Sequence, residues 1–180
     1  MSDRGLAHAE SWHTVSILWL TSGLGCDGES IALTAAQNPT FEDLQVGQSD
    51  SVGKTITEAD ILLYAAVSTD TNPIHINAEA AKLSIFGERI AHGMLSAGLI
   101  SAVLGTRLPG PGSLYMRQSL RFAAPVKIGD TVKATATVTA LNPEKKRATL
   151  STVCTVGDDV VIEGEAYVQV PSRDTVPSRD

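Results

Sequence analysis

Cysteine is nearly absent from this 180-residue chain, which has only Cys26 and Cys154 and no CxxC pair. A disulfide framework or a cysteine-based zinc site needs cysteines grouped more closely than this. The sequence therefore favours a protein without disulfides in a reducing compartment, and we expect it to be cytoplasmic. Aromatic residues make up only 4% of the chain, so we expect a core of interlocking aliphatic side chains.

Positive charge and long hydrophobic runs are also in short supply. Fourteen basic residues against 20 acidic ones leave a net charge of -6, which does not attract nucleic acid or anionic lipid. The longest apolar stretch near the N-terminus has a strongly apolar core only from Ile17 to Leu20, far short of the roughly 18 residues that span a bilayer. We therefore expect no nucleic-acid partner, no membrane span and no secretory signal.

The chain divides into one central domain and two ends. Residues 1–39 show no sustained hydrophobic period and are expected to form a poorly ordered N-terminal extension. Residues 171–180 repeat the unit PSRD and are expected to form a disordered tail. Residues 40–170 have the length of a single domain with its own core.

Helical spacing dominates the first half of this domain, where the pattern predicts helices over residues 57–70, 78–86 and 92–108. Thr57 and Asn77 are suitable N-cap residues for the first two helices. The third helix is closed by the sequence PGPG and is apolar nearly all round, which is typical of a buried helix. Its several small residues would let other backbones approach closely.

The second half changes to the period of two that is typical of strands. Four segments rich in β-branched residues are separated by turn sequences, and a fifth candidate precedes the first helix; these segments cover residues 43–57, 113–122, 130–141, 147–156 and 160–170. Because the strands occur mostly in one block, the pattern favours an α+β domain with an antiparallel sheet of five or six strands. Such a sheet wrapped around one long central helix is the hot dog fold. A homodimer, or a dimer of dimers, would cover its open edges.

A first candidate motif is the sequence STDTNPIH, which places Asp70 and His75 on either side of an Asn-Pro pair. Pro73 stiffens this loop, and a carboxylate and an imidazole held in a rigid loop suit general acid–base catalysis. The alternative is structural: Asp70 caps the turn and His75 is a hydrogen-bonded core residue.

A second candidate motif, RIAHGML, places His92 and Gly93 at the start of the third helix. The first N–H groups of a helix have no partner within it, so they suit an oxygen that gains negative charge during a reaction. A glycine would leave a ligand free to approach the backbone. Ser101 and Leu104 follow on the same stripe, which could line a tunnel. The alternative is that His92 is a cap and that Gly93 and the stripe serve packing.

These two motifs, followed by LPGPGSLYMRQSLRFAAPVKIGDTV, resemble the MaoC-like (R)-specific enoyl-CoA hydratase family over about residues 40–170. The resemblance implies a dimer that reversibly hydrates trans-2-enoyl-CoA to (R)-3-hydroxyacyl-CoA, a hydro-lyase activity. It implies that Asp70 and His75 are the acid/base pair and that the Gly93 N–H binds the thioester oxygen. It also assigns Asn72, Ser101 and Leu104 to substrate binding. The implied substrate is an acyl-CoA thioester, with no further cofactor and no metal.

Three points qualify what the resemblance implies. The two ends of the chain have no counterpart in the family's minimal form, and Thr69 stands where the family often has glycine, which bears on acyl-chain length. The residues that would hold the CoA phosphates are open, with Arg107, Arg121, Lys127 and residues 145–147 as candidates. Two other functions remain as alternatives: a hot dog acyl-CoA thioesterase, and a non-catalytic acyl-CoA-binding subunit.

Overall fold

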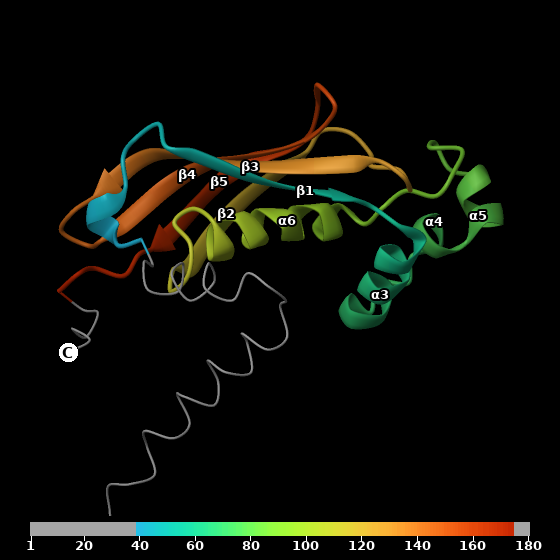
Figure 1. Ribbon diagram of the computed structural model, residues 1–180. Coiled ribbons are helices and arrows are strands. Elements are labelled where there is room, and N and C mark those ends of the chain that lie inside the picture. Colours follow the sequence, from blue (N-terminus) through green and yellow to red (C-terminus); the bar gives the residue numbers. More distant parts are fainter. Residues whose placement is uncertain (1–38, 175–180) are drawn as a thin grey trace, which may run out of the picture. The chain divides into compact units, whose positions relative to one another are not determined.

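The computed structural model describes residues 39–174, so most of the expected N-terminal extension and the last six residues of the tail lie outside the described residues. This part of the chain contains one 3-10 helix, four α-helices and five strands. Figure 1 shows their arrangement. The elements are η2 (Phe41–Asp43), β1 (Ser49–Thr55), α3 (Glu58–Ser68), α4 (Pro73–Ile76), α5 (Ala78–Lys82), α6 (Gly93–Thr106), β2 (Leu114–Phe122), β3 (Thr131–Asn142), β4 (Arg147–Val156) and β5 (Asp159–Gln169).

The five strands form one sheet in the order β1-β3-β4-β5-β2, and every neighbouring pair is antiparallel. Helix α6 lies along one face of this sheet, and α3, α4 and α5 lie beyond its end (Figure 1). This is the hot dog arrangement, so the predicted α+β fold and the antiparallel sheet are confirmed. The fifth strand is the segment that precedes the first helix, as the sequence pattern predicted.

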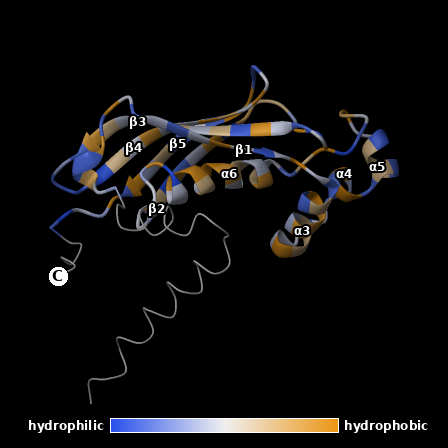
Figure 2. Cartoon of the chain, viewed as in Figure 1, coloured by the Kyte–Doolittle hydropathy of each residue, from blue (hydrophilic) through white to orange (hydrophobic). Residues whose placement is uncertain are grey.

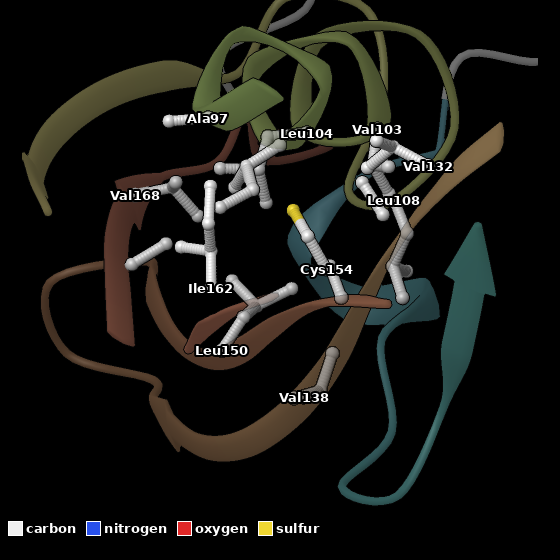
Figure 3. Close-up of a cluster of buried hydrophobic side chains, with 14 of the residues drawn as sticks. Ala97, Val103, Leu104, Leu108, Val132, Val138, Leu150, Cys154, Ile162 and Val168 are labelled. Carbon is white, nitrogen blue, oxygen red and sulfur yellow. The ribbon is translucent and has the colours of Figure 1, made fainter. Parts of the chain in front are cut away.

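The core lies between α6 and the sheet and is aliphatic, as the scarcity of aromatic residues predicts. Burial alternates along β3 and β4, so every second side chain of these strands faces the helix. Figure 3 shows Val103 and Leu104 of α6 directed toward Cys154 and other side chains of the sheet. Cys154 is a free, buried thiol, and burial raises its pKa to about 11. It therefore belongs to the core and is not a nucleophile at neutral pH.

The prediction of a fully buried central helix is wrong for the single chain. One face of α6 packs on the sheet through Ile100 and Val103, but Met94 is 53% exposed and Gly98 and Gly105 are also exposed. A single sheet can cover only one face of a helix. The other face remains apolar and open.

Local capping explains where the helices begin and end. Thr57 accepts a hydrogen bond from Asp60 N–H, and the Asp60 carboxylate accepts one from Thr57 N–H, which confirms the predicted cap. Asn77 caps α5 through its side-chain oxygen, which accepts from the N–H groups of Glu79 and Ala80. Helix α5 ends at Lys82, four residues earlier than predicted, because Ser84 Oγ donates to the carbonyl of Ala81 and competes with the helix.

Residues 171–174 contact η2, four residues beyond the domain boundary that we set at residue 170. The Phe41 N–H donates to the carbonyl of Pro171 over 2.7 Å. The Glu42 carboxylate accepts hydrogen bonds from Ser172 Oγ, Arg173 N–H and the Lys146 ammonium. This carboxylate joins η2 to the turn between β3 and β4 and to the segment that follows β5.

Candidate active site

A pocket of about 460 Å³ opens at the N-terminal end of α6 and contains three of the predicted site residues, Asp70, His75 and Gly93. Its remaining wall is mostly apolar and comes largely from residues 122–126, which follow β2. These residues are held against the start of α6 because Ala91 N–H donates to the carbonyl of Val126 over 2.7 Å. The fold therefore brings the two sequence motifs to one pocket.

Asp70 is exposed near the start of the loop that joins α3 to α4. The preceding residue, Thr69, adopts the left-handed conformation with φ 61° and ψ 10°, which a β-branched residue rarely does. A glycine would adopt this conformation without strain. Asp70 Oδ1 accepts a hydrogen bond from Asn72 N–H over 3.2 Å, which leaves the other carboxylate oxygen for a ligand.

Asn72 and Pro73 start the one-turn helix α4, which the sequence analysis did not predict. Asn72 is the N-cap, and its side-chain oxygen accepts from Ile74 N–H, while Pro73 occupies the first helical position. Asn72 is exposed and does not line the pocket. In the single chain it therefore shapes the loop that carries Asp70 and His75.

His75, on the last turn of α4, is 7% exposed. Its Nδ1 lies 2.8 Å from the carbonyl oxygen of Ile90. Because a carbonyl only accepts hydrogen bonds, Nδ1 carries a proton and donates it. The other nitrogen, Nε2, is then the proton acceptor of the neutral ring and is available to a ligand.

His92 also lines the pocket. The sequence analysis placed it in the second candidate motif and gave a helix cap as its structural alternative. It is 2% exposed, and its ring stacks on that of His75 with the centroids 3.9 Å apart. Its Nε2 lies 3.0 Å from the backbone carbonyl oxygen of Asp70. As the N-cap of α6 it makes no side-chain capping bond, so its ring is directed to the two catalytic candidates instead.

Gly93 is the first residue of α6, so its N–H has no partner inside the helix. The space that a Cβ atom would fill is already occupied: that atom would lie 2.7 Å from Cε1 of Phe122. A larger residue here would therefore require the Phe122 ring to move. This contact favours the packing interpretation of Gly93, whereas the approach of a ligand to its backbone stays a prediction.

The structure does not bring Ser101 and Leu104 to this pocket. Ser101 lies on the exposed face of α6, and Leu104 is 2% exposed in the core that faces the sheet. Neither residue lines the described pocket. Two turns of helix, about 12 Å, separate Gly93 from Ser101.

The candidate CoA-binding basic residues are mostly engaged in surface ion pairs. Lys127 is next to the pocket and bridges to Glu88, whereas Arg121 pairs with Glu163. Arg107 follows the far end of α6, about 20 Å from the pocket. Lys127 is thus the candidate nearest the site.

Asp70, His75 and His92 each offer one ligand atom, and these atoms lie within 4.8 Å of one another. Within residues 39–174 this is the one cluster whose spacing would suit a metal ion. Each imidazole already donates one N–H to a backbone carbonyl, so each has one nitrogen left for another role. The same groups are equally arranged to hold water and to move protons.

Comparison with known proteins defines first the fold and then the family. The structure is similar to that of the R-hydratase PhaJ1 from Pseudomonas aeruginosa, with a TM-score of 0.72 and 44% sequence identity over 76% of this chain and 88% of the other. It is also similar to the (R)-hydratase from A. caviae, with a TM-score of 0.70 and 44% identity over 72% of this chain and 99% of the other. The MaoC-like domain model matches residues 43–162, and the chain belongs to this family.

Two relatives in sequence have named activities. The chain is 65% identical over 133 residues to the (R)-specific enoyl-CoA hydratase of Rhodospirillum rubrum, which covers 74% of this chain and 92% of the relative. It is 52% identical to the 3-hydroxybutyryl-CoA dehydratase of Methylorubrum extorquens over 74% of this chain and 85% of the relative.

Proposed function

We propose that the protein is an (R)-specific enoyl-CoA hydratase, a hydro-lyase that reversibly adds water to trans-2-enoyl-CoA to give (R)-3-hydroxyacyl-CoA. The observation that carries this proposal is the convergence of Asp70, His75 and the N-terminus of α6 on one pocket. The names of the relatives in sequence and structure agree with it. Hydration needs a base, an acid and a site for developing negative charge, and this pocket supplies one group for each.

Asp70 and His75 divide the proton transfers in this proposal. Asp70 takes a proton from the water whose oxygen bonds to C3, and protonated His75 gives its Nε2 proton to C2. Returning the proton from Asp70 to His75 completes the cycle without net gain or loss. The Ile90 carbonyl accepts a hydrogen bond from Nδ1–H in both charge states of the ring, so His75 keeps its orientation throughout.

The backbone N–H of Gly93 is proposed to donate to the thioester oxygen. Attack of water at C3 pushes electrons toward this oxygen, so a donor there stabilises the transition state more than the ground state. The N–H also lies at the positive end of the α6 dipole. Asp70 and His75 then act at C3 and C2 of the conjugated enoyl thioester. The Gly93 N–H acts at the thioester oxygen, the other end of the same system.

The acyl chain is expected to be short. The described pocket ends before Ser101 and Leu104, so a role for these two residues in substrate binding requires the pocket to extend along α6. Crotonyl-CoA, with four acyl carbons, is therefore the first substrate to test. We further propose that no redox cofactor is needed, since hydration causes no net oxidation or reduction of the substrate. We also propose that no metal is needed, because the Gly93 N–H takes the place of a Lewis acid at the thioester oxygen.

A homodimer is proposed because apolar side chains remain open on the described chain. Leu62, Leu63 and Val67 of α3 are at least 50% exposed. Figure 2 shows hydrophobic residues along α3. Leu114 and Met116 of the edge strand β2 are similarly exposed. Apolar surface of this kind is typical of protein interfaces. Light scattering on the purified protein tests this proposal, and a monomer at micromolar concentration would contradict it.

A cytoplasmic location is proposed from the free thiol of Cys154 and from the acyl-CoA substrate. No helix within residues 39–174 is both long enough and apolar enough to cross a bilayer.

Two spectroscopic signals test the proposed reaction against thioester hydrolysis, which other hot dog proteins catalyse. With crotonyl-CoA as substrate, a hydratase removes the absorbance of the conjugated enoyl group and releases no free thiol. A thioesterase releases free CoA, which a thiol reagent detects. Free thiol without hydration would contradict the proposed function. The absence of both signals would favour a non-catalytic acyl-CoA-binding subunit.

A further inference from the structure

The side chain of His92 has no role in the chemistry proposed above, although it lies at the centre of the site. It occupies the N-cap of α6, where Ser, Thr, Asp or Asn would normally satisfy a helix N–H. His92 makes no such bond, and its ring is 98% buried between other groups. Burying an imidazole without using it as a cap requires another explanation.

The contacts of His92 reach both members of the proposed acid/base pair. Its Nε2 lies 3.0 Å from the Asp70 carbonyl oxygen, and since a carbonyl only accepts, Nε2–H is the donor. Its ring faces that of His75 with a centroid separation of 3.9 Å and an angle of 32° between the planes. Tyr64 contacts the ring as well, with its centroid at 4.9 Å.

We propose that His92 is a positioning residue that holds Asp70 and His75 in their reactive arrangement, an inference that rests on the proposed hydratase function. The bond from His92 fixes the backbone of Asp70, and the stacked ring restricts the plane of the His75 imidazole. The next residue, Gly93, carries the proposed oxyanion donor. One residue thus connects all three groups of the site.

The Asp70 loop needs such a link because its other hydrogen bonds are local. Asp70 N–H donates to Ser68 Oγ, and Asp70 Oδ1 accepts from Asn72 N–H, so both bonds stay within two residues. The bond from His92 is the one described hydrogen bond that joins Asp70 to a distant part of the chain, 22 residues away. Without this bond, Asp70 would be held only by hydrogen bonds within its own exposed loop, which follows the left-handed Thr69.

The other nitrogen of His92 has no hydrogen-bond partner among the described residues. Donation from Nε2 leaves Nδ1 of the neutral ring as an acceptor, and Nδ1 is buried without a hydrogen-bond partner among the described groups. Ser96 Oγ, one turn further along α6, is buried without a partner as well, and Ser96 also lines the pocket. A serine hydroxyl can donate to Nδ1, directly or through water, and would then fix the tautomer on which the bond to Asp70 depends.

Three substitutions separate the hydrogen bond from the packing of the ring. His92→Phe keeps an aromatic ring against His75 but removes the donor. His92→Gln removes the ring but carries an amide N–H at about the distance of Nε2 from the backbone. His92→Asn is the matched control, because its amide is one methylene shorter and does not reach the Asp70 carbonyl.

The expected result is a split between kcat and KM in the hydration of crotonyl-CoA. His92→Phe and His92→Asn should lower kcat about 100-fold, the typical cost of misplacing a catalytic group by about 1 Å. His92→Gln should recover at least tenfold of that loss, and KM should stay within about threefold in every variant. A structural role would instead make activity follow the melting temperature, with no advantage of Gln over Asn. Equal kcat for Gln and Asn, or wild-type kcat for Phe, overturns the proposal.

Hydrogen exchange of the Asn72 amide provides a readout that does not depend on the reaction. This amide bonds to Asp70 Oδ1, so it reports on the order of the loop. Exchange should be faster in His92→Phe and His92→Asn than in the wild type, and near the wild-type rate in His92→Gln. If the wild type does not hydrate crotonyl-CoA, the proposed function fails, and this exchange measurement still decides whether His92 holds the loop. Should His92→Phe fail to fold, the comparison of Gln with Asn decides alone.

Discussion

Gly93 and Phe122 are so close that a Cβ atom on residue 93 would lie 2.7 Å from Cε1 and 2.8 Å from Cδ1 of the phenylalanine ring. The two residues are 29 positions apart in the sequence, yet together they form the wall of the pocket beside the proposed oxyanion donor. A larger residue at position 93 would therefore have to displace the Phe122 ring, which can be tested directly.

Gly93→Ala should lower kcat/KM for crotonyl-CoA by about 10- to 100-fold, because the added methyl group displaces the Phe122 ring and disturbs the pocket. Replacing Phe122 by Leu in the same chain should restore part of this loss. Gly105→Ala is the matched control, since a Cβ at that helical position meets nothing within 4 Å. Equal activity of Gly93→Ala and Gly105→Ala would show that the contact with Phe122 is unimportant.

Asp70→Asn should remove activity without affecting stability. The asparagine Oδ1 can still accept the hydrogen bond from Asn72 N–H, and the side chain is exposed, so the free energy of unfolding should change by less than about 0.5 kcal/mol. Loss of the carboxylate as a base should lower kcat by about 10²- to 10⁴-fold. Steady-state kinetics and urea unfolding measure the two effects, and unchanged kcat in a folded variant would remove Asp70 from the mechanism.

His75→Ala should differ from Asp70→Asn because it should lower both the activity and the stability of the protein. It lowers kcat to a similar extent, but it also leaves the Ile90 carbonyl without its partner in a buried site. An unsatisfied buried polar group costs about 1–3 kcal/mol, so urea unfolding should show a loss of this size. A variant with full stability and full activity would contradict both the proposed role and the observed hydrogen bond.

Thr69→Gly should make the protein more stable by about 0.5–1 kcal/mol. Thr69 has a φ of 61°, a conformation that is costly for a β-branched residue and free of strain for glycine. Thr71, two residues further along the loop, does not have a positive φ, so Thr71→Gly should instead destabilise the protein through the added freedom of the unfolded chain. Similar destabilisation in both variants, measured by urea unfolding, would indicate that Thr69 is unstrained.

Glu42 should make the stability depend on acidic pH. The hydrogen bond from Lys146 is the largest of several interactions that hold the pKa of Glu42 well below its ordinary value of 4.5. A carboxylate whose pKa is lowered by folding stabilises the folded state above its unfolded pKa, and this contribution is lost as the pH falls toward the folded pKa. Glu42→Gln should therefore be less stable than the wild type at pH 7, by a margin that shrinks at pH 3. Glu144→Gln, in the nearby β3–β4 turn, is the control, and a constant margin for Glu42→Gln would contradict this role.

The sheet and the starts of α3, α5 and α6 were predictable because they depend on local signals, whereas the short helix α4 was not predicted. Alternation of apolar residues located the strands, and Thr57 and Asn77 are caps whose partners lie within three residues. The end of α5 was predicted four residues too late, since the pattern did not show that Ser84 would bond to the helix. The exposure of one face of α6 was missed because its composition alone does not show how much of a helix one sheet covers.

The site was predictable only in part, because some of its residues belong to local motifs and others meet only through the fold. Asp70, His75 and Gly93 belong to short motifs, and the fold brings them to one pocket. The contacts of His92 and the position of Phe122 arise from segments 17 to 29 residues apart, and no local pattern encodes them. The sequence RIAHGML did contain a signal for His92, namely a histidine at a helix start where a smaller cap is usual.

Chiral analysis of the product formed from crotonyl-CoA tests the central claim most directly, namely that Asp70, His75 and the N-terminus of α6 form a stereospecific hydration site. The account predicts (R)-3-hydroxybutyryl-CoA as the product, with no release of free CoA, and at least a 100-fold slower rate for Asp70→Asn. Formation of the (S) product, or of free CoA without hydration, would contradict it.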